Sequence, residues 1–175
     1  MKIQINKNQL WVLVLLSIIS CSTAHAALDA YMTIVGQSQG EIEGDVTSPG
    51  KNAGSFKITE FHHLIRKPSR IVHEPLIITT HLGQAMPLLL SAMDIGEPLT
   101  VNLKFYRPII SGKLELYYSM DLLQATIIAA EPIMLDNTSA ETASKEVNVR
   151  LRFNYTKIIH TYEINGQSVK MNATF

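Results

Sequence analysis

The sequence predicts an all-β domain of about eight strands, closed into a barrel or tight sandwich and flanked by one short helix at about residues 83–94. Apolar and polar side chains alternate strictly over residues 99–106 and again over 147–155, which is typical of strands. The helix is indicated by four apolar residues at helical spacing, namely Met86, Leu89, Leu90 and Met93. Strands with one polar face most economically close on themselves, because closure removes exposed edges.

The other elements follow from local signals along the chain. Pro87 suits the first turn of the helix, and Gly96 suits its end. The alternation changes phase at Leu122-Leu123, which predicts a bulge or bend there. Asn165-Gly166 predicts a hairpin turn. Further strands are expected over 31–35, 41–46, 55–65, 76–80, 113–121, 161–164 and 167–171, and a polar exposed loop over 136–146.

The first 26 residues have the layout of a secretory signal peptide. Lys2 and Lys7 precede an apolar run over 10–16, which is too short to span a bilayer, and Ala24-His25-Ala26 provides a small-residue cleavage site. We therefore expect a signal peptide over 1–26 and one domain over 27–175. The protein would then be exported, to the periplasm or beyond.

Cys21 is the only cysteine, so no disulfide can form within the chain. Two interpretations compete for it. Ile18-Ile19-Ser20-Cys21 fits the bacterial lipoprotein pattern, in which Cys21 is lipidated and attaches the protein to a membrane. The downstream cleavage site instead favours removal of Cys21 with the leader.

Composition and spacing argue against several function classes. The chain carries 15 basic and 15 acidic residues, and no basic stripe favours nucleic acid as a partner. His62 and His63 would point to opposite faces of a strand, and no close His spacing or carboxylate cluster accompanies His73, His81 or His160. No nucleophile elbow or phosphate loop is present. We therefore expect no enzyme activity, no catalytic residues, no cofactor and no metal site.

Several segments are similar to one known family. The segment over 87–107, PLLLSAMDIGEPLTVNLKFYR, resembles the helix and following strand of the haemolysin co-regulated protein (Hcp) family, the tube subunits of type VI secretion. AYMTIVGQSQGEIEGDV, from Ala30, resembles the start of that family. Arg70, Val72, His73 and Pro75 match its Arg-Val-His-x-Pro signature. The resemblance covers about residues 30–172, in the shared order of these motifs.

The resemblance implies a structural role without a catalytic centre. Family members form a closed β-barrel with one helix, assemble into rings expected to be homohexamers, and stack into a hollow tube that carries effectors. Partners would be further copies, sheath and spike proteins, and effectors. The family's protruding loop, which would reach the next ring, corresponds here to residues 66–74 and its candidates Arg66, Lys67, Arg70, Val72, His73 and Glu74.

The leader conflicts with this function, because such tube subunits assemble in the cytoplasm before secretion. One alternative is an exported binding module of the periplasm or cell surface, built on the same fold. Another is a misassigned start, with translation from Leu28 giving an ordinary cytoplasmic subunit. An exported hydrolase is a third alternative, which no sequence motif supports.

Overall fold

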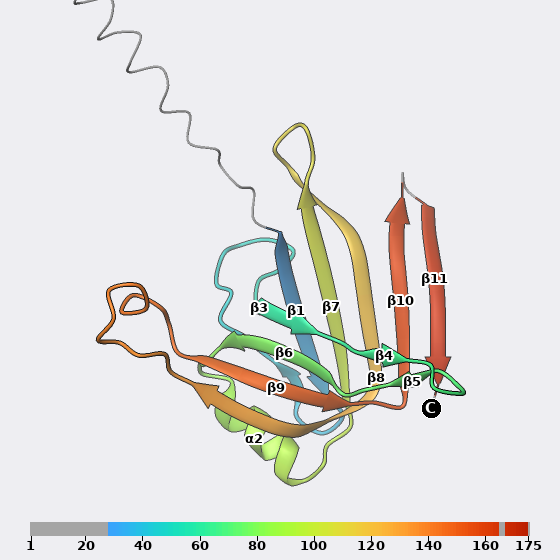
Figure 1. Ribbon diagram of the computed structural model, residues 1–175, viewed down its shortest axis with the longest axis horizontal. Coiled ribbons are helices and arrows are strands. Elements are labelled where there is room, and N and C mark those ends of the chain that lie inside the picture. The colour runs from blue at the N-terminus through green and yellow to red at the C-terminus, as the bar shows by residue number, and fades with distance from the viewer. Residues whose placement is uncertain (1–27, 165–166, 175) are drawn as a thin grey trace, which may run out of the picture.

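The computed structural model describes residues 28–164 and 167–174 (Figure 1). The strands are β1 (Asp29–Gly36), β2 (Gly40–Ile42), β3 (Phe56–His62), β4 (Ile65–Arg66), β5 (Val72–His73), β6 (Leu76–His81), β7 (Leu99–Pro108), β8 (Leu114–Ile133), β9 (Asn148–Asn154), β10 (Lys157–Ile164) and β11 (Gln167–Thr174). One helix, α2 (Met86–Asp94), lies between β6 and β7.

Six strands close into a barrel in the order β8-β7-β1-β3-β6-β9, and β9 returns to β8. All of these pairings are antiparallel. Beyond the barrel, β10 pairs with β8 and β11 pairs with β10, so these two strands extend the sheet to one side (Figure 1). The predicted closed all-β fold with one flanking helix is confirmed, although three of the strands have only two or three residues.

Closure depends on the bend in β8. Its first part pairs with β7 and β10, and its second part, from Thr126 onward, pairs with β9. Gln124 lies between the two parts with a φ of 52°, a left-handed conformation that is uncommon outside glycine. The register also shifts between Leu99 and Val101 on the neighbouring β7. The predicted phase change at Leu122-Leu123 is therefore the point where one long strand leaves one side of the barrel for the other.

The barrel interior is filled by the apolar residues of the alternating strands. Leu99, Val101 and Leu103 of β7 are buried, as are Val149, Leu151 and Phe153 of β9. Met32 and Ile34 of β1 oppose Leu103 and Val101 across the β1–β7 ladder. These side chains make one continuous hydrophobic core, as a small barrel requires.

Helix α2 covers the barrel with most of the predicted apolar face, since Leu89 is buried and Met86 and Met93 pack partly buried against the core. Leu89 and Ala92 are its buried residues, whereas Leu90, predicted on the buried face, is 42% exposed. Only one side of this nine-residue helix packs against the barrel, so part of its apolar surface remains exposed to water. The helix begins at Met86 rather than near residue 83, and Gly96 after it has a φ of 62°, as predicted for a helix end.

The remaining differences are at strand ends. The strand expected over 41–46 is only three residues long, because the chain leaves the sheet after Ile42. The predicted hairpin is confirmed by the β10–β11 ladder, in which Ile164 pairs with Gln167, while Asn165-Gly166 lies outside the described residues. The leader and Cys21 lie outside them too. Among the described residues no helix has the length and hydrophobicity needed to cross a bilayer.

Candidate functional site

The predicted protruding loop is a short hairpin, β4–β5, at residues 65–73. Ile65 pairs with His73 and Arg66 with Val72. The backbone N–H of Glu74 donates to the carbonyl oxygen of Leu64 at 3.0 Å, and the Arg66 guanidinium pairs with the Glu74 carboxylate. The hairpin is thereby a defined element whose tip, with Arg66, Lys67 and Arg70, is exposed.

The hairpin lies beside β11, the last strand of the sheet, and a groove of about 650 Å³ lies between the hairpin and this strand. One wall comes from residues 70–73 of the hairpin, and the other from residues 171–174 of β11. Asn154 and Tyr155, at the end of β9, also line it. The predicted loop residues Arg70, Val72 and His73 are therefore next to the C-terminal strand.

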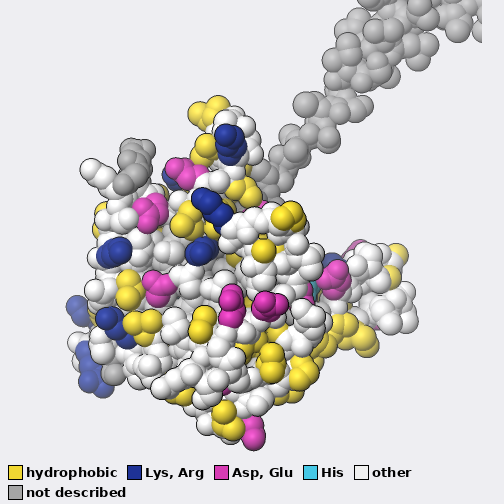
Figure 2. Space-filling view, turned by 180° about the vertical axis from the view of Figure 1, so that it is seen from behind, with side chains coloured by type: hydrophobic (Ala, Val, Ile, Leu, Met, Phe, Trp, Pro, Cys, Tyr) yellow, Lys and Arg dark blue, Asp and Glu magenta, His cyan; other side chains and the backbone are white. Residues whose placement is uncertain are grey.

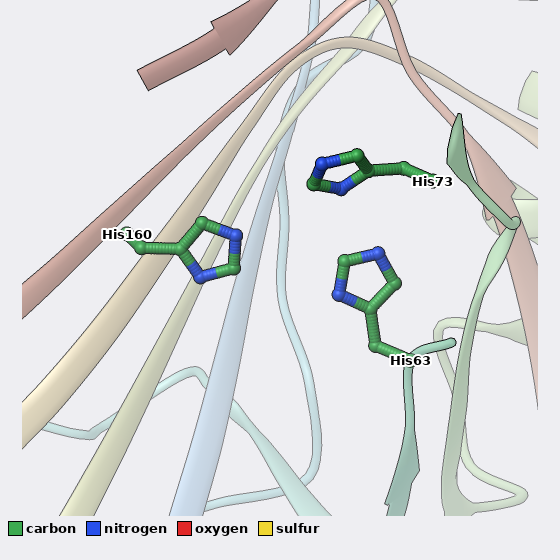
Figure 3. A group of neighbouring side chains, drawn as sticks. All are labelled: His63, His73 and His160. Carbon is green, nitrogen blue, oxygen red and sulfur yellow. The ribbon is translucent and has the colours of Figure 1, made fainter. Parts of the chain in front are cut away.

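Three histidines converge at this end of the molecule, and we call them the histidine cluster: His63, His73 and His160. His63 follows β3, His73 belongs to β5 and His160 belongs to β10. Their ring centroids are 5.3 Å apart for His63–His73, 6.1 Å for His63–His160 and 6.4 Å for His73–His160. Figure 3 shows the three rings pointing toward one another from three different elements.

Two tyrosine hydroxyls each contact one ring nitrogen of this cluster. The Tyr118 hydroxyl lies 2.6 Å from His160 Nδ1, and the Tyr155 hydroxyl lies 2.7 Å from His63 Nε2. Burial, with smaller contributions from His73 and His160, lowers the pKa of His63 to about 4. Burial also lowers the pKa of His73 and of His160, so all three rings are uncharged at neutral pH.

A second polar group, which we call the turn anchor, consists of Glu97 with Ser38 and Gln39. The backbone N–H groups of Ser38 and Gln39 donate to Glu97 Oε1 at 2.5 and 2.9 Å, and the Gln39 side chain donates to Oε2 at 2.7 Å. These hydrogen bonds, that from the Gln39 side chain first, lower the pKa of Glu97. Gly36 is needed beside them, since a Cβ there would lie 2.6 Å from Oε1. The turn anchor fastens the β1–β2 turn to the segment after α2.

Sequence reasoning found one member of the histidine cluster, His73, but as a loop residue. His63 and His160 were not predicted to meet it, because they are far apart in the chain and no local spacing links them. His62 and His81 lie outside the cluster, and His81 instead pairs with Glu146 at 2.8 Å. The strand expected over 55–65 includes His63, whereas β3 ends at His62.

Exposed apolar side chains lie at several places on the described surface, and two of these places are on separate sides of the barrel. One is α2 and the residue after it, with Leu88, Leu90 and Ile95. The other is the edge strand β11, where Val169 is 63% and Met171 48% exposed. Figure 2 shows apolar side chains gathered low on the molecule, and basic side chains mostly toward the edge where Figure 1 places β10, β11 and the β4–β5 hairpin.

Comparison with known proteins identifies the fold. Residues 31–162 match the family described as "Type VI secretion system effector, Hcp". The chain is 29% identical over 160 residues to the "Major exported protein" of Pseudomonas aeruginosa, covering 81% of this chain and 93% of that one.

Solved structures agree with this match. The secreted protein Hcp3 from Pseudomonas aeruginosa is 30% identical, with a TM-score of 0.69 over 83% of this chain and 98% of its own. The crystal structure of another Hcp protein has a TM-score of 0.75 at 24% identity, over 83% of this chain and 98% of its own. The barrel fold is thus shared along most of the described domain, and the chain belongs to the Hcp family of type VI secretion tube subunits.

Proposed function

We propose that this tube subunit closes head to tail into a ring, a homohexamer, and that the rings stack through the β4–β5 hairpin. A closed ring needs two different surfaces that fit each other, because each copy then uses both. The observation that carries the proposal is the pair of exposed apolar surfaces, on α2 and on β11. They lie on different sides of the barrel (Figure 1), as a head-to-tail contact requires.

The β4–β5 hairpin suits contact between rings. Leu64, Ile65 and Ile71 are exposed around it, next to the basic Arg66, Lys67 and Arg70 at its tip. Exposed aliphatic side chains surrounded by charges are typical of protein contact surfaces. Sheath or spike proteins and effectors would be further partners, and the subunit would act structurally, without a catalytic centre.

Export through a cleaved leader is the second part of the proposal. The relative from Pseudomonas aeruginosa is named as an exported protein, which supports secretion of this chain. Lys2, Lys7, the apolar run and Ala24-His25-Ala26 support cleavage after Ala26. Lipidation at Cys21 would instead leave the protein bound to a membrane.

Sedimentation tests the ring. We expect the purified protein to sediment as a closed oligomer, and Val169→Asp to yield monomers, because a charge at the contact strand costs desolvation energy. Asn172→Asp, on the same strand, is the matched control and should leave the oligomer intact. A protein that stays monomeric over a wide concentration range would contradict the ring.

Mass spectrometry of the mature N-terminus tests the leader. A protein that begins at Ala27 supports cleavage after Ala26. A fatty-acylated Cys21, or an intact chain from Met1 or Leu28, would contradict it. Because this measurement does not depend on oligomer state, the ring and the leader can fail separately.

A further inference from the structure

The histidine cluster has the donor set of a transition-metal site. His63, His73 and His160 each offer a ring nitrogen, and these three atoms all lie within 4.8 Å of one another. Tetrahedral zinc with Zn–N bonds of about 2.0–2.1 Å would bring the nitrogens to roughly 3.4 Å apart. The nitrogens would have to approach one another by at most about 1.4 Å. This is within reach, since the β4–β5 hairpin pairs only with itself among the described strands.

The tyrosines orient the rings in the way that metal-binding histidines require. A ligating histidine usually donates its second ring N–H to an oxygen, which sets the tautomer. His160 can donate from Nδ1 to the Tyr118 hydroxyl, 2.6 Å away, and His63 from Nε2 to the Tyr155 hydroxyl, 2.7 Å away. His160 Nε2 and His63 Nδ1 are then the nitrogens that carry lone pairs. His160 Nε2 is buried and makes no hydrogen bond with any residue that the structure describes.

The ligand chemistry selects the kind of ion. Three imidazoles without a carboxylate suit zinc, copper or nickel, whereas calcium and magnesium need oxygen ligands. Three protein ligands also leave a fourth position for water or a further group. The lowered pKa of each ring means that an ion displaces no proton at neutral pH.

We propose that His63, His73 and His160 form a binding site for a divalent transition-metal ion, zinc in the first place, with an open fourth position. The ion joins three segments: the end of β3, the β4–β5 hairpin and β10 (Figure 3). Its binding therefore fastens the hairpin to the extended sheet. This site stands on the geometry of one chain and does not depend on ring formation.

Zinc titration of the untagged, purified protein by calorimetry, after treatment with a chelator, tests the site. We expect one zinc ion per chain. His160→Gln and His73→Gln should each weaken zinc binding by at least about tenfold, since each removes a ligand. Tyr118→Phe should weaken it by about tenfold, because it removes the hydrogen bond between the Tyr118 hydroxyl and His160 Nδ1. His62→Gln, next to the cluster but outside it, is the matched control and should bind like the wild type.

Two measurements on the wild type keep the proposal testable if a variant fails to fold. Cobalt(II) should give the intense visible bands of a tetrahedral site, and zinc should shift the ring proton resonances of three histidines in the NMR spectrum. Zinc affinity that is the same in His160→Gln as in His62→Gln would overturn the site. So would octahedral cobalt spectra, or zinc shifts confined to histidines outside the cluster.

Discussion

The turn anchor and the histidine cluster are both assembled from distant segments around one barrel, but their polar atoms are used differently. At the turn anchor, both carboxylate oxygens of Glu97 accept hydrogen bonds from Ser38 and Gln39. At the histidine cluster, the tyrosines contact His160 Nδ1 and His63 Nε2, and His160 Nε2 accepts no hydrogen bond among the described residues. A buried polar group whose atoms are all hydrogen-bonded supports the fold, whereas a buried ring with one nitrogen that makes no hydrogen bond can bind a ligand.

The two groups also differ in charge, because the turn anchor holds an ionised carboxylate and the histidine cluster holds uncharged rings. Hydrogen bonds to the ionised form lower the pKa of Glu97, so the fold holds a charged carboxylate there. Burial lowers the pKa of His63, and the fold holds it uncharged. The first arrangement stabilises a turn, and the second keeps lone pairs available.

The largest expected effect breaks the barrel that positions both groups. Leu103→Asp should destabilise the domain by more than about 4 kcal/mol, because a carboxylate would be buried in the core between Met32 and Met120. Urea unfolding followed by circular dichroism measures it. Asn102 is unsuitable as a mild control, since its side chain donates to Asp121 and an Asp there would face a like charge. Thr100→Asp, exposed on the same strand, should change stability little, and equal losses for both would contradict the assigned interior.

The next effect tests the turn anchor alone. Gly36→Ala should cost about 2 kcal/mol, because the new methyl group would collide with Glu97 Oε1 and push the carboxylate from its donors. Gly40→Ala in the same hairpin is the control. Its φ of 74° makes alanine strained, but no atom lies within 4 Å of the added Cβ, so a smaller loss of about 1 kcal/mol is expected. Chemical denaturation distinguishes the two, and a harmless Gly36→Ala would contradict the role of the close contact.

A third test uses pH at the turn anchor. The folded-state pKa of Glu97 lies below its unfolded value of 4.5, so its contribution is full above that value and is lost as pH falls through the folded pKa. Thermal unfolding between pH 6 and about 2 should therefore show less acid sensitivity in Glu97→Gln than in the wild type. The variant should also be less stable than the wild type at pH 6. If the unfolding temperatures of the wild type and Glu97→Gln fell in parallel with pH, the pKa of Glu97 would not be lowered by the fold.

The smallest effect is expected at the histidine cluster without metal. Tyr118→Phe removes one hydrogen bond, to His160, and should cost about 1 kcal/mol or less in chelator-treated protein. Differential scanning calorimetry measures it, with Tyr117→Phe on the neighbouring position as control. A loss as large as that of Gly36→Ala would mean that the cluster supports the fold in the way the turn anchor does, and the contrast between the two would disappear.

Local patterns in the sequence determined most of the strands. The alternation over 99–106 and 147–155 predicted β7 and β9 with the correct buried faces, because side chains in a strand repeat every two residues whatever the strand pairs with. The phase change at Leu122-Leu123 and the hairpin signal at 165–166 were also local, and the bend of β8 and the β10–β11 pairing confirm them. The family followed from the order of such segments.

Only the tertiary structure decided which residues meet across the barrel. The closure of β8 onto β9 brings β10 beside the β4–β5 hairpin, and this places His160 next to His63 and His73. The tertiary structure also left Leu90 exposed, because α2 packs on the barrel with the side that carries Leu89 and Ala92, with Met86 and Met93 partly buried against the core. Alternation and spacing report each strand's own faces, but contacts between distant segments depend on the order and bending of all the strands, which no single segment of sequence records.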